Sequence, residues 1–98
     1  MPGPRKLPRP FEMHWGHGEI VEEASYLNEY HEACIQLLEY QDDEHSGYLT
    51  LRFCSYSPRG AFQRSPLMLG EDDIDGLRES LKSTPRLRAL LGRLAEQA

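Results

Sequence analysis

The residues from Tyr48 to Tyr56, YLTLRFCSY, alternate between apolar side chains and side chains of other kinds. A period of two is typical of a β-strand, in which successive side chains lie on opposite faces of the sheet. Leu49, Leu51 and Phe53 are therefore expected to point into the core. The residues of the other face are aromatic, polar or sulfur-bearing: Tyr48, Thr50, Arg52, Cys54 and Tyr56. The middle of the chain thus predicts a sheet with two unlike faces.

A turn and a second strand are expected to follow. In the turn Ser57–Gly60, the final glycine tolerates the positive φ angle that such turns need. The next strand is expected over Ala61–Leu69, and Pro66, which has no backbone donor, indicates an edge strand or a bulge. Its side chains divide between the two faces, with Leu67 and Leu69 toward the core and Phe62 and Arg64 on the other side.

Two further strands are expected on the N-terminal side. Ala33–Gln41 is a short apolar run rich in β-forming residues, and the polar turn Asp42–Gly47 follows it. Glu19–Tyr30 is ambiguous, because the spacing of its apolar residues also fits one face of a helix. We favour a strand that starts as Glu19–Ala24, since the other strands need a partner edge.

The C-terminal part of the chain is expected to be helical. Gly70–Lys82 begins with three acids, which suit the positive end of a helix dipole, and Ile74 and Leu77 start an apolar stripe. Thr84 and Pro85 supply an N-cap and a first residue for a second short helix. The predicted fold class is α+β, a curved four-stranded antiparallel sheet followed by one broken or two short C-terminal helices packed on one side.

The N-terminal residues 1–10, MPGPRKLPRP, contain four prolines and three basic side chains. Because proline lacks the donor that helices and sheets use, we expect residues 1–18 to form a flexible, basic arm and a short transition. Residues 19–98 are expected to form a single ββββα(α) domain. His14 and His17 are spaced as metal ligands on a helix would be, but adjacent glycines disfavour a helix, so no metal is expected.

Composition disfavours several functional classes. Sixteen acids against eleven Lys and Arg give a net charge of −5, which disfavours indiscriminate binding to nucleic acid. No signal peptide and no apolar run of ~18 residues are evident, so a cytoplasmic location is expected. Nothing in the spacing of potential nucleophiles and bases demands catalysis, so neither an enzyme nor a cofactor is expected.

Cys34 and Cys54 are expected to be reduced and buried, with a cross-strand bridge as the alternative.

The stretch Gly47–Leu69 departs from the acidic background. It contains three arginines, four of the nine aromatic residues and no acid. Sequence-tolerant binding of a single strand needs aromatic rings that stack on bases beside cations that hold phosphates. The candidate nucleic-acid-binding residues are Tyr48, Arg52, Tyr56, Arg59, Phe62 and Arg64. In the alternative interpretation the tyrosines pack across strands, Arg52 pairs with an acid such as Glu39, and Arg59 is solvated.

Four motifs carry a family resemblance: Leu49–Arg52 with Tyr56, Ser57–Gly60, Ser65–Leu69 and Glu71–Ile74. In this order they resemble the single-stranded DNA-binding domain of transcriptional coactivators of the positive-cofactor-four type and their bacterial relatives. The resemblance implies a homodimer whose two sheets form a groove for single-stranded DNA or RNA. The expected function is therefore single-strand binding in a transcription-related role. The alternative is a non-enzymatic protein-interaction or dimerisation domain of the same fold.

Overall fold

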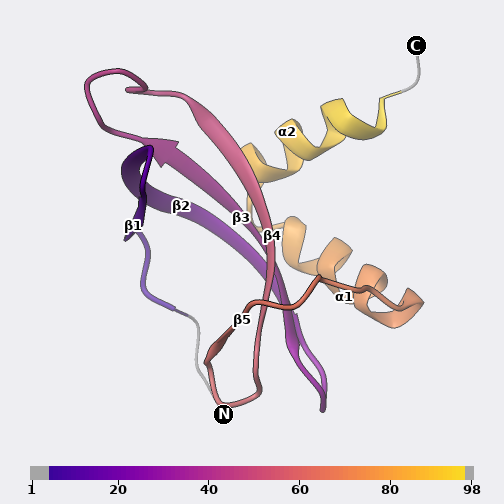
Figure 1. Ribbon diagram of the computed structural model, residues 1–98. Helices are drawn as coiled ribbons and strands as arrows, with labels where there is room; N and C mark the ends of the chain where they lie inside the picture. Colours follow the sequence, from indigo (N-terminus) through magenta and orange to yellow (C-terminus); the bar gives the residue numbers. More distant parts are fainter. Residues whose placement is uncertain (1–4, 97–98) are drawn as a thin grey trace.

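The structure is a computed structural model that describes residues 5–96 (Figure 1). Five antiparallel strands form one sheet in the order β1-β2-β3-β4-β5, and two helices follow them. The bounds are Arg9–Met13 (β1), Gly16–Leu27 (β2), Glu32–Tyr40 (β3), Leu49–Tyr56 (β4), Phe62–Gln63 (β5), Glu71–Leu81 (α1) and Pro85–Ala95 (α2). The sheet curls into a half-barrel. This is the α+β fold class that the sequence predicts, with one strand more than expected.

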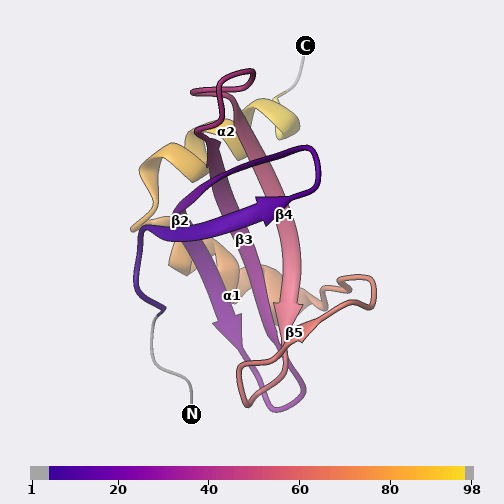
Figure 2. The same ribbon diagram turned by 60° about the vertical axis from the view of Figure 1, so that its left-hand side comes forward.

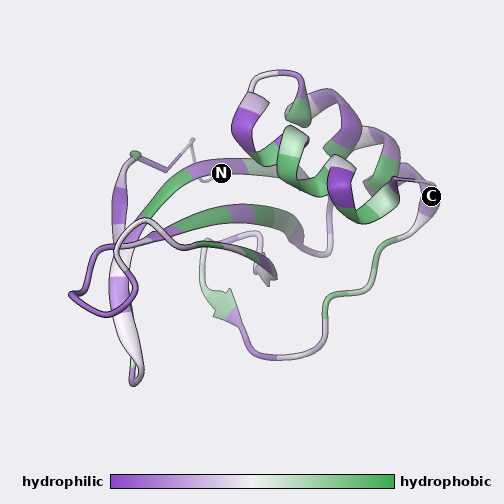
Figure 3. Cartoon of the chain, turned by 90° about the horizontal axis from the view of Figure 1, so that it is seen from above, coloured by the Kyte–Doolittle hydropathy of each residue, from purple (hydrophilic) through white to green (hydrophobic). Residues whose placement is uncertain are grey.

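Both helices cover the same face of the sheet, and their apolar sides turn toward it (Figure 3). The core between these layers contains the fully buried Leu37 of β3 and Leu87 of α2. Other buried members of this core are Ala24, Ala33, Ile35 and Leu77. Removal of this apolar surface from water is the main force that holds the helices on the sheet. In the described part of the chain, neither helix is long and apolar enough to cross a membrane.

A β-bulge interrupts β2 between Ile20 and Glu22. Before the bulge, Ile20 lies opposite Leu38 and belongs to a small core on the face turned away from the helices. After the bulge, Ala24 lies opposite Ile35 in the helix-side core. A bulge bends its strand and increases the local twist. The β1–β2 hairpin curls accordingly, and β1 crosses the face that the helices leave open (Figure 2).

Most elements lie where the sequence predicts them. The bounds of β3, β4 and α1 differ from the expected ones by a single residue at each end or less, and Pro85 is the first residue of α2. Gly60 adopts the positive φ angle expected of it, at 93°. Glu19–Tyr30 falls mainly in β2, so the helical alternative is wrong.

The strand expected over Ala61–Leu69 is mostly wrong. Only Phe62 and Gln63 pair with β4, and the chain then leaves the sheet. Pro66 supplies no donor to a ladder. Leu67 packs against the helix-side core, which draws this segment around the edge of β4 toward α1.

The flexible arm expected over residues 1–18 also needs correction. Arg9–Met13 forms β1 and pairs with the start of β2, so it belongs to the folded domain. Pro10 is compatible with this position because β1 is an edge strand, where a missing donor costs little. Phe11 is buried and packs edge-to-face on Tyr40 at 5.1 Å between ring centroids. Residues 1–4 of the expected arm lie outside the described residues.

Candidate functional site

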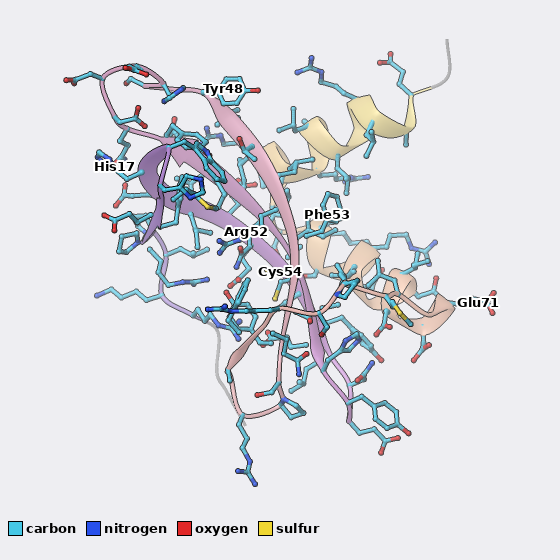
Figure 4. All side chains as sticks on the ribbon, in the orientation of Figure 1. His17, Tyr48, Arg52, Phe53, Cys54 and Glu71 are labelled. Atoms are coloured by element: carbon cyan, nitrogen blue, oxygen red, sulfur yellow. The ribbon has the colours of Figure 1, made fainter. Side chains whose placement is uncertain are left out.

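The face of the sheet that the helices leave open carries most of the polar side chains that the alternation in β4 predicts. We call it the polar face; its central members are Glu23, Glu32, Cys34, Gln36, Arg52, Cys54 and Tyr56. Figure 4 shows Arg52 and Cys54 on this side of β4 and Phe53 on the helix side. The assignment of Arg52 and Leu51 to opposite faces is therefore correct.

A buried glutamine connects the charged groups of the polar face. Gln36 is fully buried, and its amide donates to Glu23 Oε2 at 2.6 Å and to the Tyr56 hydroxyl at 3.1 Å. Arg52 donates from Nε to Gln36 Oε1 at 2.7 Å. The expected alternative partner of Arg52, Glu39, instead lies 3.8 Å from Arg86 of α2. The Nε donor of Arg52 is thus satisfied within the protein.

The N-terminal segment covers the far end of this network. The Arg5 guanidinium lies 3.6 Å from the centroid of the Tyr56 ring, and its Nη2 donates to Glu32 Oε1 at 2.8 Å. Arg9 donates to Glu23 Oε2 at 3.2 Å. Tyr56 is consequently only 8% exposed. Its ring face is occupied by Arg5, so it offers no platform for a nucleic-acid base in this arrangement.

Five of the six predicted site residues lie where β4 meets β5. The ring of Phe62 is 50% exposed, packs edge-to-face with Tyr56 at 5.6 Å, and has the Arg52 guanidinium 5.5 Å from its centroid. Arg59 in the preceding turn and Arg64 after β5 are exposed. We call Arg52, Tyr56, Arg59, Phe62 and Arg64 the hairpin cluster. It has one accessible ring and two freely exposed arginines.

Tyr48 does not belong to the hairpin cluster. It precedes β4 at the opposite end of the strand, roughly 26 Å from Tyr56 at the usual rise per residue. Figure 4 shows it at that end. Tyr48 is 65% exposed and packs beside Tyr40 at 6.1 Å between ring centroids. The six predicted residues therefore do not form one continuous surface.

Cys34 and Cys54 lie directly opposite each other on β3 and β4, and both are free and buried. The neighbouring Cys34 thiol and then the Arg52 guanidinium lower the pKa of Cys54, although burial opposes them. The same contact with Cys54, together with burial, raises the pKa of Cys34. The Arg52 guanidinium thus favours the thiolate at Cys54 over that at Cys34.

A second surface lies on the helix side of β4, where the sequence predicts only core. Phe53 is 45% exposed and Leu69 is 37% exposed, so their assignment to a closed core is wrong. They line an apolar groove of about 390 Å³, here called the β4 groove, together with Ile35, Ile74, Leu77, Arg78, Leu81 and Leu91. An adjoining hollow of about 610 Å³ continues along β4 past Tyr48, Leu90 and Arg93. The apolar residue Ile74 among the acids of the first turn of α1 was a sequence signal for this surface.

A hollow of about 740 Å³ lies between the β2–β3 turn and the start of α1. Its most buried charge is Asp73, which accepts from the Asn28 side chain at 2.8 Å and from the Gly70 backbone at 3.0 Å. His31 Nε2 is 3.6 Å away from the same carboxylate. These contacts cap α1 and fix the β2–β3 turn, so the Asp73 carboxylate has a structural role.

Within residues 5–96, no three side chains of the His, Cys, Asp and Glu types come together as a metal site would need. No family model matches the chain, and neither a curated protein nor a solved structure does. Function must therefore be inferred from the surfaces themselves.

Proposed function

We propose that this protein is a non-catalytic interaction module that binds an extended segment of another protein along the outer edge of β4. The observation that carries the proposal is the free edge of β4 beside the β4 groove. β5 pairs only with Ser55 and Tyr56, so residues 49–54 have no strand partner on their outer side within the described chain. An unpaired strand edge is a ready template for another strand.

The hydrogen-bonding pattern gives the direction of the free backbone groups. Tyr40 donates its backbone N–H to the carbonyl of Tyr48, in register with the β3–β4 ladder. Alternate residues of a strand direct their backbone groups to opposite sides. The amides of Leu49, Leu51 and Phe53 consequently point outward, away from β3. The free edge is about 20 Å long at the usual rise per residue.

The β4 groove supplies the chemistry for side-chain recognition. Phe53, Leu69 and Ile74 expose apolar surface there, and Arg78 and Arg93 are the charged residues that line the two adjoining hollows. Added strands gain affinity from main-chain bonds and specificity from pockets for alternate side chains. An apolar segment with acidic side chains fits this lining. A second copy of the chain would bring like charges together, so we assign the edge to a different protein.

Selection from a library of extended ten-residue peptides, displayed on phage, tests this proposal. We expect binders in which apolar and acidic residues alternate, and chemical-shift changes concentrated at residues 49–54. Phe53→Ala should weaken binding by about tenfold, from the lost burial of one ring. Phe53→Pro should abolish it, because proline removes an outward amide without touching the β3 ladder.

Tyr30→Ala is the matched control, since Tyr30 is an exposed aromatic residue in the β2–β3 turn. It should leave binding unchanged. Selected peptides that keep their affinity when alternate backbone amides are methylated would contradict strand addition. A selection that enriches no peptide would contradict the proposal as a whole.

A second candidate function is single-strand binding at the hairpin cluster. The Arg52 guanidinium over the exposed ring of Phe62, with Arg59 and Arg64 exposed nearby, favours it. Binding of a labelled twenty-nucleotide thymidine strand at low salt is the test. If Arg59 and Arg64 each hold one phosphate, the slope of log K against log salt should be about −1.4, at roughly −0.7 per phosphate.

The variant Arg59→Ala with Arg64→Ala should abolish that binding, whereas Arg86→Ala with Arg88→Ala on α2 should not. An absence of binding at low salt would exclude the nucleic-acid function. The same hypothesis includes the homodimer that the family resemblance implies. Sedimentation equilibrium tests for the homodimer, and a monomer at high protein concentration would exclude it.

A further inference from the structure

The Arg5 guanidinium sits in a seat built by three neighbouring strands. Glu23 comes from β2, Glu32 from β3 and Tyr56 from β4. Arg5 Nη2 donates to Glu32 at 2.8 Å, Nη1 lies 3.8 Å from Glu23, and the guanidinium carbon lies 3.6 Å from the centroid of the Tyr56 ring. The side chains of Glu23 and Glu32 are 6% and 11% exposed. The seat is therefore a partly desolvated site that three paired strands frame.

This chemistry selects a guanidinium over other cations. A guanidinium is planar and presents several donors in one fork, so it can reach two carboxylates while it stacks on an aromatic face. An ammonium group is a compact, strongly hydrated charge without a flat face. Gln36 fixes the seat, because its amide bonds both Glu23 and the Tyr56 hydroxyl.

The segment that contains Arg5 makes few contacts with the rest of the domain. Residues 5–8 precede β1 and make no strand, and Lys6, Leu7 and Pro8 are exposed. Arg9 is the next anchor, through Glu23. Arg5 can thus leave the seat without disturbing the pairing of β1.

Removal of the cation from the seat costs free energy. Among the described residues, Arg5 is the cation that pairs with Glu32. A nearly buried carboxylate that loses its partner is strongly unfavourable. Departure of Arg5 is therefore coupled to its replacement by another cation of the same shape.

We propose that Glu23, Glu32 and Tyr56 form a binding site for an arginine side chain of a partner protein, and that Arg5 occupies this site from within the chain when the partner is absent. The site lies on the polar face, separate from the free edge of β4, so it goes beyond the proposed function and does not depend on it. The N-terminal segment acts as an internal competitor. A partner segment must supply an arginine to displace it.

Chemical rescue of the full-length Arg5→Ala variant tests the proposal. We expect the variant to melt roughly 5–15 °C below the wild type, because Glu32 loses its cation. Millimolar N-acetyl-arginine methylamide should restore much of the lost Tm, and the lysine analogue should be at least about fivefold weaker. The double variant Arg5→Ala, Glu32→Gln should not respond to either compound.

Arg59→Ala removes an exposed arginine outside the seat and is the control, which should respond like the wild type. If Arg5→Ala does not fold, Arg5→Lys takes its place, since it keeps a charge but loses the fork and the flat face. Rescue of either variant by the arginine compound alone supports the site. Equal effects of the arginine and lysine compounds, an equal response with Glu32→Gln present, or no rescue would overturn it.

Discussion

Gly76 of α1 lies against the aromatic ring of Tyr26 in β2, so closely that a Cβ atom at position 76 would overlap the Cγ and Cδ1 atoms of that ring. These atoms are at the root of the ring, so a small rotation of its far end gives no relief. The missing side chain therefore sets how closely α1 approaches the sheet. Ser25 confirms the close approach, because its backbone N–H donates to Ser80 of α1 at 3.0 Å.

We predict that Gly76→Ala destabilises the protein. Helix propensity alone favours alanine by about 1 kcal/mol. Overpacking against Tyr26 should cost about 1–3 kcal/mol and outweigh that gain. Gly92→Ala in α2 is the matched change, because a Cβ atom there meets nothing within 4 Å. It should stabilise the protein by about 0.5–1 kcal/mol. Urea denaturation of both variants measures the difference, and equal shifts of the same sign would contradict the packing argument.

Glu22 should contribute to stability as the cap of α2. Thr84 occupies the N-cap position as the sequence predicts, but its hydroxyl donates to Leu81. The Glu22 carboxylate of β2 accepts the Leu87 N–H at 2.7 Å and the Arg86 N–H at 3.4 Å. Glu22→Ala should therefore cost about 1 kcal/mol in the free energy of unfolding, as loss of a helix cap does.

Glu29→Ala is the control for the cap, because Glu29 is an exposed acid for which the described residues supply no hydrogen-bond partner. Its unfolding free energy should stay within about 0.5 kcal/mol of the wild type. Hydrogen exchange of the Leu87 amide should accelerate in Glu22→Ala alone. Equal protection of that amide in both variants would exclude a capping role.

Gln36→Leu should be costly despite a similar side-chain volume. The change leaves Arg52 Nε without its acceptor and removes the donor to Glu23 and Tyr56. Polar groups that lose their partners in a buried site cost about 1–3 kcal/mol each, so a total of about 2–4 kcal/mol is expected. Gln41→Leu, which loses one exposed bond to Glu19, should cost less than about 0.5 kcal/mol. Chemical denaturation of the two variants makes the comparison.

The cysteine pair should titrate in a fixed order. The pKa of Cys54 is lowered by Cys34 and Arg52, whereas that of Cys34 is raised. The Cβ carbon resonance of Cys54 should therefore shift at lower pH than that of Cys34. Arg52→Gln removes a positive charge that favours the thiolate, so it should raise the pKa of Cys54. A reversed order of titration in the wild type would contradict the assignment.

The strand β4 was predictable from the sequence because its side chains alternate without interruption from Tyr48 to Cys54. The helices α1 and α2 were predictable because each combines a typical helix start with an apolar stripe at helical spacing. The start is three acids in α1 and Thr84 with Pro85 in α2. In β2, by contrast, the bulge breaks the alternation, so that Ile20 belongs to the smaller core whereas Val21 and Ala24 pack in the helix-side core. The ambiguity of Glu19–Tyr30 has that physical origin.

The candidate surfaces were less predictable, because they depend on contacts between distant parts of the chain. Alternation placed Arg52 on the polar face correctly, but nothing local shows that Arg5 would cover Tyr56. Exposure of Phe53 follows from the short β5, which in turn reflects where Leu67 packs. Single-strand binding and dimerisation stay predictions that the experiments above test.

The bulge in β2 also has a consequence for changes in chain length. Val21 is the inserted residue, because Ile20 and Glu22 already face opposite sides of the sheet as neighbours in a regular strand would. Deletion of Val21 would therefore preserve the face assignments of its neighbours, but it would remove both the bend and the contact of Val21 with the helix-side core. The flattened hairpin would carry Phe11 away from Leu38 and Tyr40, and so open the smaller core. One inserted amino acid thus bends the sheet over its own open face. A shortened β2 would open the smaller core to solvent, whereas the helix-side core would lose only the contribution of Val21.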